Sequence, residues 1–159
     1  MAAKDYTGQH HWLELDNNPS DKYLDLFLGQ NIVWQRITHA NIFCLTDNNM
    51  VILDSMAFIS CDKNYRNWLL GLLNSNIMTF YLRSITPAYG AEGFRLSNQF
   101  LELVPIPKMV ENVVDKYVAS LSGEFKTDIY NSLNALIAKF YNLTDLEYRY
   151  IADKYTIIH

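Results

Sequence analysis

The spacing of apolar residues divides the chain into a mixed first part and a helical last part. Residues 31–38 combine β-branched and aromatic side chains with partial alternation, which predicts a strand. A short strand pair is predicted at 42–45 and 50–54, closed by a polar loop at 47–49. A further strand is predicted at 57–60.

The clearest helix is predicted to run from Tyr65 to Thr86 as one long element. Its apolar residues recur at i, i+3, i+4 and i+7, and Asp62 is a suitable N-cap. The glycine-containing segment 88–97 is predicted to be a loop with a short strand. Residues 101–107 then predict a closing strand, which their two prolines place at a sheet edge or end.

The remainder of the chain is predicted to be helical. Apolar stripes lie at 110–121 and 129–140, and a capping box from Thr144 to Glu147 opens a third helix. We expect an α+β fold, with a mixed small sheet and one long packed helix followed by a helical C-terminal part. The expected organisation is a lead-in at 1–22, a recognition core at 23–108 and a helical region at 109–159.

Composition indicates a folded protein with a sizeable core, since half of its residues are hydrophobic. We expect a cytoplasmic protein, because two cysteines are too few for a disulfide framework. No apolar run is long enough to predict a transmembrane helix, and the first residues lack the pattern of a signal peptide. Cys44 and Cys61 have no metal-ligand spacing, and we expect two buried thiols. His10 and His11 could suggest a metal site, but adjacent histidines on a lead-in are more often solvated. We therefore predict no metal.

The charge distribution restricts where nucleic acid could bind. The formal net charge is −4, which is unusual for a free-standing DNA-binding protein. Residues 1–29 carry two basic and five acidic groups, and residues 109–159 carry five and seven. Residues 30–108 carry six basic and five acidic groups. Any DNA contact is therefore expected in this middle segment, with a larger parent enzyme contributing further basic groups.

The motifs that carry catalysis are absent from the sequence. It contains no glycine-rich phosphate loop, no nucleophile elbow and no zinc-protease signature. The Asn/Asp-Pro-Pro-Tyr/Phe signature of adenine methyltransferases is also missing. Whether the chain takes part in an enzyme stays open, and we predict no catalytic residue within it.

Three segments, in this order, carry a resemblance to a known family. They are Asn31-Ile32-Val33-Trp34-Gln35-Arg36-Ile37, Trp68-Leu69-Leu70-Gly71-Leu72-Leu73-Asn74-Ser75 and Leu101-Glu102-Leu103-Val104-Pro105-Ile106-Pro107. The chain resembles the TaqI-type C-terminal specificity domain of adenine-specific DNA methyltransferases and combined restriction–modification enzymes. The tail from Leu136 to Glu147 looks like that family's terminal helices, with Asn142 where glycine is common.

This resemblance implies a bacterial DNA-recognition module without its own catalytic centre. Its expected partners are double-stranded DNA and a methyltransferase domain or subunit, often with an endonuclease on the same chain or complex. S-adenosylmethionine is expected in the methyltransferase part, and no cofactor in this chain. The target DNA sequence does not follow from the resemblance.

Two neighbouring residues on the first predicted strand are candidates for reading bases. Gln35 can pair with adenine and Arg36 can fork onto guanine, but on a strand they point to opposite faces. At most one of them is then expected to face DNA, and we favour Arg36. The alternative is that Arg36 pairs with a local carboxylate. His39, which follows the strand, could touch a base or a phosphate, and its alternative is a structural role.

The glycine-containing segment 88–97 supplies further candidates. Tyr89, Gly90 and Arg95 fit a base-reading loop on a rigid scaffold, and the alternative is an ordinary surface loop. Arg83 and Lys108 could contact phosphates, which would position the protein without reading sequence. The alternative for Arg83 is a cation that stabilises the end of its helix.

A second function class remains open at this stage. Acidic flanks, aromatic residues and apolar stripes would also suit a protein–protein interaction module with no role on DNA. A small standalone enzyme ranks last, because no catalytic constellation is visible.

Overall fold

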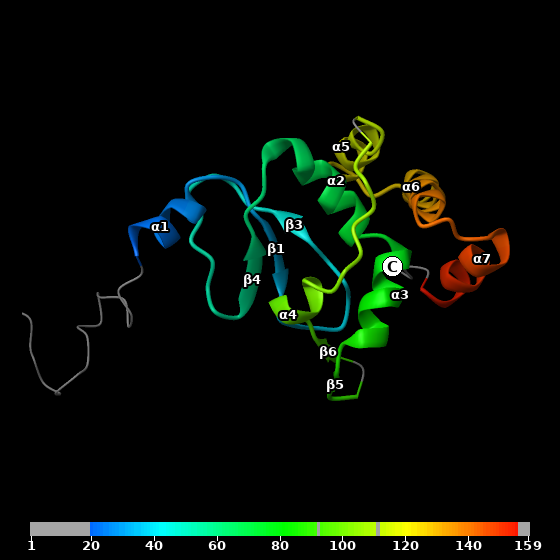
Figure 1. Cartoon of the computed structure of the whole chain (residues 1–159), viewed down its shortest axis with the longest axis horizontal. Helices are drawn as coiled ribbons and strands as arrows, with labels where there is room; N and C mark the ends of the chain where they lie inside the picture. Colours follow the sequence, from blue (N-terminus) through cyan, green and yellow to red (C-terminus); the bar gives the residue numbers. More distant parts are fainter. Residues whose placement is uncertain (1–19, 92, 111, 156–159) are drawn as a thin grey trace, which may run out of the picture.

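The computed structural model describes residues 20–91, 93–110 and 112–155, so the predicted lead-in up to residue 19 and its two histidines lie outside the described residues. Two small antiparallel sheets lie against a group of helices, which confirms the predicted α+β class (Figure 1). The predicted mixed sheet is instead two three-stranded sheets, and every strand pair in them is antiparallel.

The first sheet has strand β1 (Ile32–Gln35) at its centre, between β3 (Cys44–Leu45) and β4 (Met56–Ile59). The short helices α1 (Asp21–Leu24) and η1 (Asp25–Phe27) precede it. Ile32, Val33 and Trp34 are all buried, so both faces of β1 are covered. The predicted hairpin of 42–45 with 50–54 is wrong, because β3 pairs with β1 and 50–54 forms no strand.

The predicted strand at 31–38 is interrupted at Arg36, where the chain passes into the second sheet. That sheet contains β2 (Ile37–Thr38), β6 (Gly93–Arg95) and β5 (Ala88–Tyr89), in this order. The Arg36 N–H donates to the Ser55 carbonyl at 3.2 Å, and the Arg36 carbonyl accepts from the Leu96 N–H at 2.8 Å. The indole Nε1 of Trp34 also donates to the Leu96 carbonyl, at 3.0 Å. These bonds tie the two sheets together.

The predicted long helix is two helices, α2 (Lys63–Leu73) and α3 (Asn76–Ile85). The predicted N-cap of α2 is confirmed, since the Asp62 side chain accepts from the Asn64 N–H. The break falls at Asn74 and Ser75 because Ser75 caps α3 by accepting from the Met78 N–H. The apolar spacing continues across the break, which is why the sequence predicts one element.

Asn74 fastens this break to the first sheet. Its side-chain oxygen accepts from the Phe43 N–H, and its Nδ2 donates to the Phe43 carbonyl, both at 2.9 Å. Replacing Asn74 with alanine would leave both groups without these partners, so we expect a loss of about 1–3 kcal/mol in the free energy of unfolding. Urea denaturation measures the loss. Asn64→Ala, on the exposed first turn of α2, is the control and should change the free energy by less than about 0.5 kcal/mol.

The predicted closing strand at 101–107 is wrong. Helix α4 (Asn98–Leu101) is followed by irregular chain. Leu101 at the end of α4 and Val104 after it are buried, while Leu103 and Ile106 are exposed. Burial three residues apart is the spacing of a helical turn and differs from the alternation of a strand. The Val104 N–H accordingly donates to the Leu101 carbonyl at 3.1 Å.

The helical C-terminal part contains α5 (Asp115–Leu121), α6 (Thr127–Phe140) and α7 (Asp145–Lys154). The predicted capping box at the start of α7 is confirmed. One hydrophobic core continues from the sheets into these helices, since Leu133, Ile137 and Ile151 belong to the same cluster as Trp34. Gly71 lets α2 approach α5 closely, because a Cβ there would lie 2.5 Å from the Val114 side chain.

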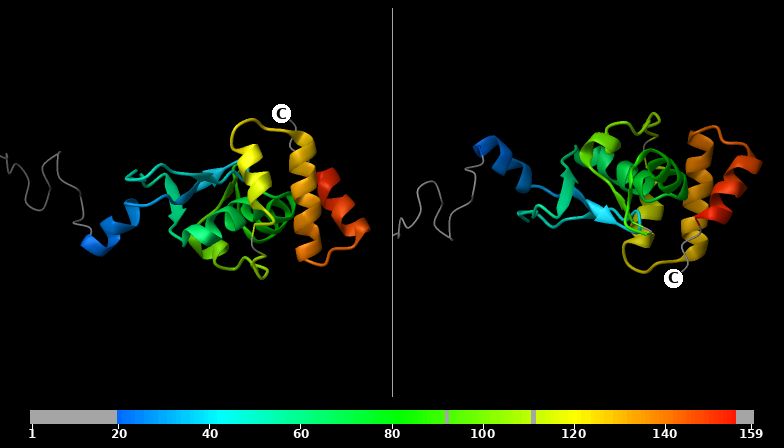
Figure 2. Two further views of the ribbon diagram at one scale, coloured as in Figure 1. Left: turned by 90° about the horizontal axis from the view of Figure 1, so that it is seen from above. Right: turned by 90° about the horizontal axis from the view of Figure 1, so that it is seen from below.

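The molecule is elongated, with α1 and the first sheet toward one end and α6 and α7 at the other (Figure 2). Helix α3 lies between them and contacts α4, α6 and α7. The expectation of two buried thiols is wrong for Cys44, which is exposed on β3, while Cys61 is half-buried. Within the described residues, no helix is long and apolar enough to cross a membrane.

Candidate functional site

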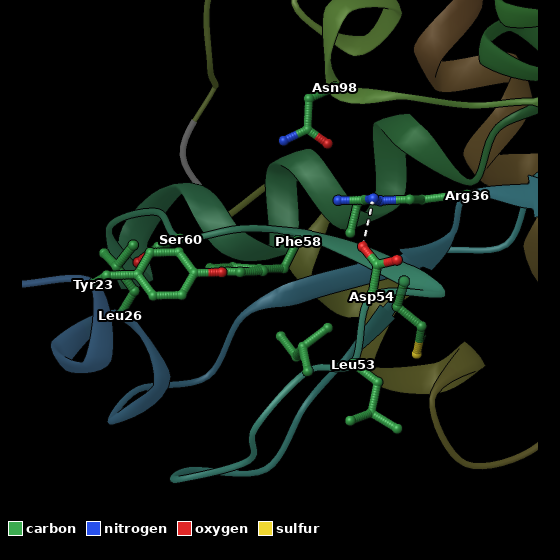
Figure 3. Close-up of a pocket in the computed structure, with 11 residues that line it drawn as sticks. Tyr23, Leu26, Arg36, Leu53, Asp54, Phe58, Ser60 and Asn98 are labelled. Carbon is green, nitrogen blue, oxygen red and sulfur yellow. Dashed lines mark hydrogen bonds and ion pairs between the residues drawn. The ribbon is translucent and has the colours of Figure 1, made fainter. Parts of the chain in front are cut away.

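The side chain of Arg36 lies in an open groove beside the first sheet (Figure 3). The groove has a volume of about 640 Å³. Besides Arg36, residues of α1 and η1, of the chain from 52 to 60 and of the start of α4 line it. The lining side chains that argue for binding are the polar Arg36, Asp54 and Asn98 and the aromatic Tyr23 and Phe58.

Arg36 and Asp54 form an ion pair at the edge of this groove. Arg36 Nη1 donates to Asp54 Oδ1 at 2.9 Å, and the two side chains are 45% and 98% exposed. Such an exposed pair contributes little to stability. The alternative considered from the sequence, that Arg36 pairs with a local carboxylate, is therefore confirmed. Arg36 nevertheless stays accessible to a ligand.

Aromatic rings pack against one another along one side of the groove. The Phe27 and Phe58 ring centroids are 5.2 Å apart, and Tyr23 meets Phe27 edge-on at 5.3 Å. Together with the contact of Tyr23 with Phe58, they pack α1 and η1 against β4. The sequence did not single out Tyr23, Asp54 or Asn98 as site residues, because only the pairing of β1 with β4 and the position of α4 bring them beside Arg36.

The predicted base-reading loop is the β-hairpin of β5 and β6. Tyr89 lies opposite Gly93, and Arg95 lies opposite Ile37 on β2. Because alternate residues of a strand share a face, Tyr89, Ile37 and Arg95 project from one face of the second sheet. All three are exposed. We call this surface the hairpin face.

Glycines shape the tip of this hairpin. Gly90 has a φ of 65°, a conformation that favours glycine in a tight turn. A Cβ on Gly93 would lie 2.7 Å from the Tyr89 carbonyl oxygen, so no larger residue fits there. The hairpin therefore presents Tyr89 and Arg95 on a defined backbone.

Arg83 and His39 lie together beside the hairpin. The Arg83 guanidinium lies over the Phe94 ring at 4.8 Å and donates from Nη2 to the His39 carbonyl. Arg83 is half-buried near the end of α3, whereas the His39 side chain is exposed. These contacts give Arg83 a structural role in joining α3 to the second sheet.

The structure does not bring together the two remaining candidates from the sequence, Gln35 and Lys108. Gln35 ends β1 and is exposed like Arg36. Burial therefore does not decide between them, and that at most one of the two faces DNA stays a prediction. The bend at Arg36 breaks the alternation that the prediction assumed. Lys108 follows a segment held on the helical part, where the Tyr141 hydroxyl donates to the Pro105 carbonyl at 2.8 Å.

Several titratable groups with shifted pKa values lie in the helical C-terminal part. Burial raises the pKa of Tyr130 on α6 and of Tyr141 after it, and hydrogen bonds from Thr144 lower the pKa of Glu147. Within the described ranges, no group of three or more His, Cys, Asp and Glu side chains is placed to hold a metal ion. The chemistry that the groove and hairpin face present is hydrogen bonding, positive charge and aromatic contact.

The family model described as the TaqI-like C-terminal specificity domain matches residues 3–106. This range contains the groove and the hairpin face. A search of curated proteins finds no match to the chain.

Proposed function

The chain belongs to the TaqI-like C-terminal specificity domain family, and on this premise we propose that it is the sequence-specific DNA-recognition module of a bacterial restriction–modification enzyme. Membership of this family implies a DNA-recognition role. One observation carries the assignment to a surface: Arg36 is accessible beside an open groove, on a backbone bonded to both sheets.

The proposal extends to the remaining parts of the enzyme. An adenine-specific methyltransferase domain or subunit would supply S-adenosylmethionine and the catalytic centre, and an endonuclease can share the same chain or complex. The net charge of −4 supports such an arrangement, because an acidic module needs basic groups from elsewhere to hold DNA tightly.

Changing both Arg36 and Arg95 to alanine is expected to weaken binding of the chain to duplex DNA by about tenfold or more. Arg36 is expected to contact a base and Arg95 a phosphate. Losing the phosphate contact should also flatten the dependence of the logarithm of affinity on the logarithm of salt concentration by about 0.9. Fluorescence anisotropy with a labelled duplex, over a series of low salt concentrations, measures both changes.

The control variant changes Lys139 and Arg149 to alanine. It removes the same formal charge from exposed positions on α6 and α7, far from the groove. Its salt dependence should match that of the unaltered chain. If the two double variants weakened DNA binding equally, the affinity would depend only on net charge, and the proposed surface would be wrong.

A protein-interaction module without a role on DNA is favoured by exposed apolar side chains on the two stretches of chain that flank β3. Ile42 before β3 is 61% exposed, and Val51 and Leu53 after it are 68% and 73% exposed. Large apolar side chains left exposed can belong to a docking site. A dimer in gel filtration, together with no DNA shift at low salt, would support this function instead.

A further inference from the structure

The ion pair in the groove carries an inference that rests on the proposed function and deepens it. We propose that Asp54 is a specificity-determining residue, which positions Arg36 to read the guanine of a G·C pair in the major groove of the bound DNA. Arg36 was a candidate from the sequence, whereas Asp54 enters only through the structure. The ligand is the edge of one base pair.

The contact between the two side chains leaves one edge of the guanidinium free to bind. Asp54 engages the terminal nitrogen Nη1. Nε and Nη2 lie along a different edge and form a planar fork of two N–H donors. Figure 3 shows Arg36 between Asp54 and Asn98, within the open groove. This free fork matches the two acceptors, O6 and N7, that guanine presents in the major groove.

The backbones of both residues are fixed relative to each other. The Arg36 N–H donates to the carbonyl of Ser55, the residue next to Asp54. Asp54 itself lies in a turn closed by a bond from the Met56 N–H to the Leu53 carbonyl at 3.0 Å. An arginine held in this way loses less side-chain freedom on binding, which favours a defined hydrogen-bond geometry.

The exposed carboxylate explains why the pair would prefer a base edge to a phosphate. A phosphate that approached Arg36 would meet the negative charge of Asp54, whose side chain is 98% exposed. The major-groove edge of guanine carries no net charge. In the same base pair, the N4 amino group of cytosine can donate a hydrogen bond to the second carboxylate oxygen of Asp54. A thymine at that position offers an acceptor and would be disfavoured.

The experiment selects binding sites from a pool of DNA duplexes with a randomised central window. The full chain is incubated with the pool at low salt, and the retained DNA is sequenced. The unaltered chain should enrich a motif with one strongly preferred guanine. Asp54→Asn should retain at least as much total DNA, since one negative charge is removed, while the preference for that guanine falls by about fivefold or more. Arg36→Lys keeps the charge but loses the fork, and should lose the same preference.

Asp47→Asn is the matched control. Asp47 is exposed on the same stretch of chain and its change alters the net charge equally. It should leave the guanine preference unchanged. An unaltered preference in Asp54→Asn, or a selected motif that Arg36→Lys does not change, would overturn the inference while leaving the proposed function standing. A chain that retains no DNA would contradict the proposed function, and retention without any preferred sequence would overturn the inference.

Discussion

Replacing Trp34 with alanine is expected to lower the free energy of unfolding by about 3–5 kcal/mol, a large share of the stability of a domain this size. Trp34 is 2% exposed, and its ring lies 5.5 Å from that of Phe43. Its Nε1 also donates to Leu96, so one side chain both fills the first sheet's core and bonds to the second sheet. Chemical denaturation followed by far-ultraviolet circular dichroism measures the loss.

The smaller change Trp34→Phe separates these two contributions. Phenylalanine keeps an aromatic ring in the core but cannot donate to the Leu96 carbonyl, so we expect a loss of about 1–3 kcal/mol from the missing hydrogen bond. If Trp34→Ala were no more destabilising than Trp34→Phe, the ring would not be part of a packed core. The whole loss would then come from the missing hydrogen bond to the Leu96 carbonyl.

Ending the chain after Ser122 is expected to abolish cooperative folding of the remaining part. The deletion removes Leu133 and Ile137, which are 1% and 0% exposed and belong to the central cluster. It also removes Asn134, whose side chain accepts from the Asn76 N–H at the start of α3 at 2.7 Å. Although the family match ends at residue 106, the core continues into α6. Thermal melting should show no sharp transition.

Two single changes test the same point within the full chain. Ile137→Ala should cost about 2–5 kcal/mol, because its side chain is fully buried. Leu146→Ala on α7 should change the free energy of unfolding by less than about 0.5 kcal/mol, since Leu146 is 77% exposed. A truncated chain that still melts cooperatively, near the temperature of the full chain, would show that the remaining part folds without α6 and α7.

Features set by neighbouring residues could be predicted from the sequence. The cap at Asp62 and the capping box at Thr144 depend on side chains two or three residues from the N–H groups that they bind. The central part of the first strand and helix α6 could likewise be predicted, because the spacing of their apolar residues is a local pattern. Asn142 follows α6 with a φ of 53°, the left-handed conformation in which glycine or asparagine commonly ends a helix.

Features that depend on distant residues could not be predicted. The contact that joins the break between α2 and α3 to the chain beside β3 depends on Asn74, whose partner Phe43 is 31 residues away. The partner of Arg36 lies 18 residues along the chain and reaches it only because β1 pairs with β4. The sequence therefore indicated Arg36 but neither Asp54 nor the groove that surrounds them.

The most direct test of the DNA-binding surface maps amide chemical shifts of the labelled full chain as a short duplex is added at low salt. We predict the largest changes at Arg36, Asp54 and the hairpin residues 88–95, with little change on α7. Changes confined to α6 and α7, or no change at any DNA concentration, would contradict the proposal that this surface recognises DNA.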